Sequence, residues 1–69
     1  MRKYNEILRN ALESGKEFEE LTEIEKMVLA MKRSIEEIKV ETDEVRKELL
    51  GMLIGKLSID LKEMGIDFN

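Results

Sequence analysis

The scarcity of residues that interrupt helices constrains this chain most. Its 69 residues contain no proline and only four glycines, and no glycine lies between Gly15 and Gly51. Because proline breaks helices and glycine often ends them, the chain has few places where it must turn. Its apolar residues also recur at intervals of three and four, which is the spacing of a helix face. The sequence therefore predicts an all-α fold with no strand pairing.

The first apolar stripe predicts a short N-terminal helix over residues 2–14. Glycine reaches positive φ without steric cost, so Gly15 suits the position just past the end of this helix. The apolar side chains of the stripe fall at i, i+3, i+4, i+7 and i+8, and they are Tyr4, Ile7, Leu8, Ala11 and Leu12.

A capping box predicts where the second helix begins. Thr22 and Glu25 are three residues apart, so the Thr22 hydroxyl can accept a hydrogen bond from the Glu25 amide. The Glu25 side chain can accept one from the Thr22 amide in return. The pattern that follows predicts a helix over residues 23–39. The preceding segment, 16–21, is interpreted as a connector.

The third helix, predicted over residues 43–64, has a clear end. Gly65 and Ile66 have the positions of a Schellman motif, in which Ile66 contacts Leu61 one turn back. The tail that follows, with Phe68, is expected to fold back onto the helices. Apolar residues cover more than one face of this helix, which is typical of a helix buried on several sides, so we expect it to be central.

Residues 39–43 leave two architectures open. Thr42 or Asp43 can cap a new helix with an acidic first turn, which favours a turn and a small bundle of two or three helices, a short N-terminal helix plus a helical hairpin. The 4-3 spacing nevertheless continues across this segment. The alternative is one long helix over residues 22–64, about 65 Å long, in a coiled-coil dimer.

The small size of the chain predicts assembly. We expect one helical domain over residues 1–69, and a core of this size is marginal by itself. The chain contains neither cysteine nor histidine, so disulfides and the usual zinc sites cannot stabilise it. We therefore expect a homo-oligomer.

Two glycines inside the third helix suggest where another helix packs. Each glycine in a helix costs about 1 kcal/mol relative to alanine, and a close approach of two backbones can offset that cost. The sequence predicts a helix-packing or oligomer interface formed by Gly51, Met52, Leu53, Gly55 and Ser58. It leaves open whether the partner is the first helix or a second subunit.

The inventory of reactive side chains predicts that the protein is not an enzyme. Without histidine or cysteine, the chain lacks the usual neutral-pH base and the thiol nucleophile, and its serines have no histidine to activate them. Glycine-rich phosphate loops and histidine-containing metal motifs are also absent from the sequence. We expect no catalytic residues, no metal and no cofactor.

The charge distribution predicts the kind of partner. The net charge is −4 and the pI is about 4.9, which argues against nucleic acid as a partner. The longest apolar run is too short to span a membrane. The N-terminal residues are charged, so we expect no secretory signal and a cytoplasmic location. A possible acidic partner face is formed by Glu17, Glu19, Glu20, Glu23 and Glu25.

Two functions are compatible with these patterns. The first is a non-enzymatic protein–protein interaction module, a small homo-oligomeric helical adaptor or regulator that binds itself and another protein. The alternative is an acidic decoy or inhibitor that blocks the basic nucleic-acid-binding surface of a target. A strong salt dependence of partner binding favours the second.

Overall fold

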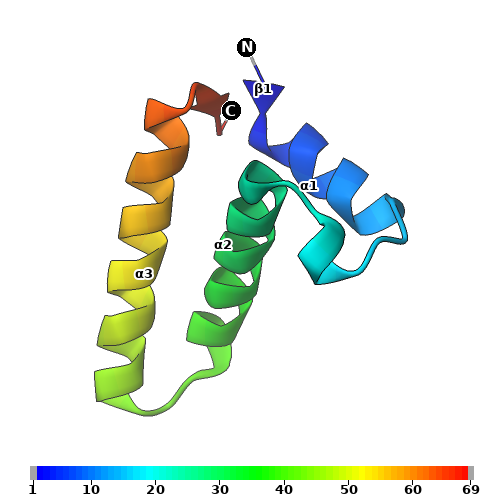
Figure 1. Cartoon of the computed structure of the whole chain (residues 1–69). Coiled ribbons are helices and arrows are strands. Elements are labelled where there is room, and N and C mark those ends of the chain that lie inside the picture. Colours follow the sequence, from blue (N-terminus) through cyan, green and yellow to red (C-terminus); the bar gives the residue numbers. More distant parts are fainter. Residues whose placement is uncertain (1, 69) are drawn as a thin grey trace.

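The computed structural model describes residues 2–68 and confirms a small all-α fold (Figure 1). A helix α1 (Tyr4–Glu13) is followed by a 3-10 turn η1 (Phe18–Glu20), and then by α2 (Glu23–Val40) and α3 (Glu44–Glu63). Two short strands, β1 (Arg2–Lys3) and β2 (Ile66–Asp67), flank the helices. The helices α2 and α3 form a hairpin, and α2 lies between α1 and α3.

The prediction that no strands pair is wrong at the chain ends. Arg2 and Lys3 pair in parallel with Ile66 and Asp67, so α1 begins at Tyr4 and not at residue 2. The cause lies at the end of α3, where Gly65 has a φ of 85° and turns the chain back. Ile66 then enters the core, and its backbone lies beside that of β1.

The predicted start of α2 is confirmed in detail. The Thr22 hydroxyl accepts from the Glu25 amide at 3.2 Å, and the Glu25 carboxylate accepts from the Thr22 amide at 2.9 Å. Both hydrogen bonds of a capping box are therefore present, and they satisfy two amides that the first turn leaves without a helical partner.

The chain turns at residues 41–43, so the alternative of one long helix over 22–64 is wrong. The Asp43 carboxylate caps α3 by accepting from the amides of Val45 and Arg46, at 2.9 and 3.4 Å. The Glu41 carboxylate accepts from the amides of Thr42 and Asp43, each at 3.1 Å. These local hydrogen bonds favour the turn over a continuation of the helix.

The predicted end of α3 is also confirmed. The Gly65 amide donates to the Lys62 carbonyl at 3.0 Å, and the positive φ of Gly65 is the backbone state that the motif needs. Ile66 and Leu61 belong to one buried cluster. The tail folds back as expected, because the Phe68 ring lies 5.2 Å from the Tyr4 ring, between centroids.

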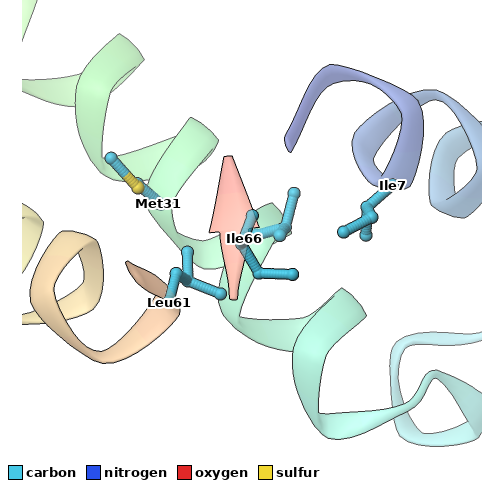
Figure 2. Close-up of a cluster of buried hydrophobic side chains, with 5 residues drawn as sticks. Ile7, Met31, Leu61 and Ile66 are labelled. Carbon is cyan, nitrogen blue, oxygen red and sulfur yellow. The ribbon is translucent and has the colours of Figure 1, made fainter. Parts of the chain in front are cut away.

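The core lies at the end of the hairpin where β1 pairs with β2. Its main cluster takes one or two residues from each of α1, α2, α3 and β2, namely Ile7, Val28, Met31, Leu61 and Ile66. Figure 2 shows Ile7, Met31, Leu61 and Ile66 of this cluster on different parts of the chain. A second cluster beneath η1 contains Ala11, Leu21 and Leu29. Among the described residues, these eight are the only buried apolar side chains, so the opposite end of the hairpin has no buried apolar side chain.

Candidate interaction surface

Helix α3 carries two apolar stripes on opposite faces. The stripe that packs towards α2 contains half-buried or buried residues separated by four, three and four positions, namely Leu50, Ile54, Leu57 and Leu61. This spacing matches one helix face. The remaining large apolar side chains of α3 are exposed.

The other stripe faces solvent, and we call it the outer stripe. Its members are between 59% and 70% exposed, and they are Val45, Leu49, Met52 and Ile59. Leu53, which is 46% exposed, lies at its edge. A helix that is apolar on both faces is expected to be covered on both. The prediction that the third helix is central is wrong for the single chain. Helix α2 occupies the central position, between α1 and α3 (Figure 1).

The glycine motif does not form a close helix crossing within the chain. A Cβ at Gly51 would lie 4.0 Å from the Ile38 Cδ1 atom, which is an ordinary contact, and a Cβ at Gly55 would meet nothing within 4 Å. Ser58 is half-buried. No crossing with α1 uses these glycines. The other partner that the sequence left open, a second subunit, stays a prediction.

The predicted interface residues lie on different parts of α3. Met52 belongs to the outer stripe and Leu53 lies at its edge, whereas Gly51 lies next to Ile38 of α2. The prediction omitted Val45, Leu49 and Ile59. The sequence did contain a signal for Val45 and Leu49, because the 4-3 spacing that suggested a coiled coil includes both residues.

A shallow open groove runs beside the outer stripe, lined by Arg46, Leu49, Leu50 and Leu53. Arg46 is held at its rim by two carboxylates of α2 and the turn. Its guanidinium pairs with Glu37 and, at 2.8 Å, with Glu41. The Asp43 amide, and after it Arg46, hold the pKa of Glu41 below its ordinary value. The groove is therefore apolar with a neutralised charge at one end.

The five glutamates of the predicted acidic face differ in their exposure to solvent. Glu17, Glu19, Glu20 and Glu23 are exposed around η1. Glu25 is half-buried in the capping box, where hydrogen bonds from Thr22 lower its pKa. Four of the five carboxylates therefore remain accessible to a partner.

Basic side chains lie next to this acidic segment. The Phe18 ring of η1 lies 5.7 Å from the Lys26 Nζ atom and 5.6 Å from the Arg33 Cζ atom, measured to the ring centroid. Both distances fit cation–π contacts, which hold η1 against α2. The positive charges of α2 reduce the negative potential of the segment at short range.

Residues 2–68 form neither a metal-binding cluster nor a membrane-spanning helix. No three acidic side chains there are grouped closely enough to hold a metal ion. No helix in that range is both long and apolar enough to cross a bilayer. Comparison of the chain with family models, with curated proteins and with solved structures finds no match.

Proposed function

We propose that this chain is a non-enzymatic protein–protein interaction module, a small homo-oligomeric helical adaptor or regulator that self-associates through α3 and binds another protein. The outer stripe carries this proposal. Four large apolar side chains lie on one helix face, and each is more than half exposed. Contiguous apolar patches of this kind are typical of binding surfaces on small proteins.

The total surface area supports the proposal. The chain exposes 5005 Å², whereas a folded monomer of 8.1 kDa typically exposes about 4,500 Å². The excess of about 500 Å² is comparable with the large patches that mark functional surfaces on monomers. Burying the outer stripe would remove much of it.

Analytical ultracentrifugation across the micromolar range tests the proposal. We expect a mass of at least twice 8.1 kDa. The double variant Leu49→Gln, Met52→Gln should be monomeric and keep its helical circular dichroism spectrum, because both side chains are exposed in the single chain. The control, Leu12→Gln, changes a leucine of α1 that is also more than half exposed and should leave the mass unchanged. A wild type that stays monomeric throughout this range contradicts the proposal.

The acidic decoy or inhibitor remains the second candidate, because Glu17, Glu19, Glu20 and Glu23 are all exposed. The acidic residues further along the chain support it less. Glu37 and Glu41 pair with Arg46, and their charges are therefore partly neutralised. A decoy is expected to depend on the segment around η1.

A further inference from the structure

The outer stripe belongs to a heptad pattern that extends over the whole of α3. Residues 45, 52 and 59 are seven apart and apolar, and we assign them to heptad position d. Position a is then occupied by Leu49, Lys56 and Glu63. The flanking e positions are Arg46, Leu53 and Asp60, and the flanking g positions are Glu48, Gly55 and Lys62.

The a positions argue against a parallel pair of α3 helices. In a parallel coiled coil each a residue faces its own copy. Lys56 would then face Lys56, and Glu63 would face Glu63, so two pairs of like charges would occupy the seam. In an antiparallel pair each a residue faces a d residue. Lys56 then faces Met52 of the second copy, and its aliphatic stem can cover that side chain.

The flanking charges fit the antiparallel pair. The a residues face the d residues when the two-fold axis lies at the level of Ile54. In that register each e position lies nearest an e position of the other copy, and each g position lies nearest a g position. Arg46 then faces Asp60 of the second copy, and Glu48 faces Lys62. Two-fold symmetry repeats both contacts, so all four charged flanking pairs join opposite charges.

The pairing of Glu48 with Lys62 is the more informative of the two. Arg46 already pairs with Glu37 and Glu41, and Asp60 already pairs with Lys56 at 3.1 Å. Glu48 and Lys62 form no ion pair within the described part of the chain. Fourteen residues of helix separate them by about 21 Å, so they cannot pair with each other inside one α3.

Gly55 provides an independent observation at the same place. It is a g residue next to the level of Ile54, so it faces Gly55 of the second copy near the two-fold axis. Apart from its two chain neighbours and the nearby backbone of its own helix, no atom of the single chain lies within 4 Å of the Cβ position that this residue lacks. The absence of a side chain is therefore unexplained by the fold and fits a close approach between two helices.

We infer that α3 binds α3 of a second copy in antiparallel orientation, about a two-fold axis level with Ile54, so that Glu48 of each copy faces Lys62 of the other. This inference rests on the proposed self-association. In the dimer α3 lies between two helices, α2 on one face and the second α3 on the other. Its apolar character on both faces then has a physical cause.

Charge reversal tests the orientation. Glu48→Lys and Lys62→Glu each place like charges opposite each other twice per dimer, and each should weaken dimerisation about tenfold at low salt. The double variant should restore the wild-type dissociation constant. The two single variants should also pair preferentially with each other when mixed, because all four residues then face opposite charges. Sedimentation equilibrium measures each constant.

Further variants distinguish a wrong orientation of the two helices from an absence of self-association. Glu13→Lys makes the same charge change on an exposed residue of α1 and should not alter the dissociation constant beyond the general effect of net charge. Gly55→Leu should weaken the dimer and leave the circular dichroism spectrum unchanged, because Gly55 is exposed and a Cβ there contacts nothing outside its own helix. Failure of the double variant to restore binding overturns the antiparallel register while self-association stands. A monomeric wild type overturns both.

Discussion

At the scale of single residues, short-range hydrogen bonds decide where helices begin. The Thr22 side chain and the Glu25 side chain each satisfy an amide at the start of α2, and Asp43 does the same for α3. Each bond joins groups no more than three residues apart. Their partners are therefore readable from the sequence, which is why these boundaries were predicted well.

Thr22→Ala should lower the free energy of unfolding by about 1 kcal/mol, because it removes the hydroxyl that accepts from the Glu25 amide. Chemical denaturation at fixed protein concentration measures the loss. Thr42→Ala is the matched control, since only the backbone amide of Thr42 makes a hydrogen bond in the turn. Equal losses in the two variants would contradict the role given to the cap.

The stability of the hairpin turn should depend on pH through Glu41. Hydrogen bonds from Asp43 and Arg46 lower its pKa in the folded chain below the ordinary 4.5. A carboxylate with a depressed folded pKa contributes stability that is present above the unfolded pKa and is lost as the pH falls through the folded one. Denaturation midpoints should therefore fall as the pH decreases below 4.5.

The matched variants identify the group responsible. Glu41→Gln should reduce the slope in that acidic window, because glutamine does not titrate, and the lowered pKa values of Glu25 and Glu36 should account for part of the slope that remains. Glu13→Gln changes an exposed carboxylate that forms no ion pair among the described residues, and it should leave the slope as it is. A Glu41→Gln protein with the wild-type slope would show that the turn does not carry this dependence.

At the scale of helices and strands, glycine has opposite effects on helix α3 at positions 51 and 65. Gly65 has a φ of 85° and ends α3, whereas Gly51 lies inside the helix with only the Ile38 side chain near its missing Cβ. Gly65→Ala should destabilise the protein by about 1 to 2 kcal/mol, because alanine is strained in the left-handed region. Gly51→Ala should stabilise it by up to about 1 kcal/mol, because alanine favours the helix and adds an ordinary contact.

Thermal unfolding of the two alanine variants and of the wild type shows whether each substitution raises or lowers the stability of the protein. The pair is its own control, since each variant adds one methyl group to the same helix or its end. A stabilised Gly65→Ala would contradict the backbone reason for that glycine. A destabilised Gly51→Ala would indicate that another helix approaches closely there.

The elements that the sequence did not predict depend on distant contacts. Pairing of Arg2 with Ile66 requires that the end of α3 lie beside the start of α1, and no local pattern encodes that contact between the two ends of the chain. The candidate interface was incomplete for a similar reason. Helix α3 has two apolar stripes of nearly equal strength, and only the position of α2 shows that Val45, Leu49 and Ile59 are left exposed.

At the scale of the whole molecule, the core occupies one end and the shape is elongated. The chain measures 34 × 26 × 19 Å, and its Cα radius of gyration is 12.5 Å, compared with about 11 Å for a compact domain of this length. Packing a second copy along α3 would shield the end of the hairpin that lacks buried apolar side chains. The interface and the partner both stay predictions.

The distribution of charge gives the last prediction. Glu19, Glu20 and Glu23 are exposed, so changing all three to glutamine should alter the free energy of unfolding by no more than about 0.5 kcal/mol. If the segment around η1 steers basic partners, the triple variant should associate several-fold more slowly with an oligolysine peptide at low salt. The difference should vanish as salt rises, because charges are screened beyond about 8 Å at physiological ionic strength.

A second triple variant separates a local patch from net charge. Glu6, Glu13 and Glu44 are also exposed but lie on other parts of the molecule and outside the proposed α3 seam, and changing them to glutamine removes the same three charges. Stopped-flow fluorescence with a labelled peptide compares the two association rates. A slower rate only for the η1 variant favours the acidic decoy, because the loss then depends on where the charges lie. Equal rates in the two variants would show that the segment only contributes to solubility, and the outer stripe would remain the binding surface.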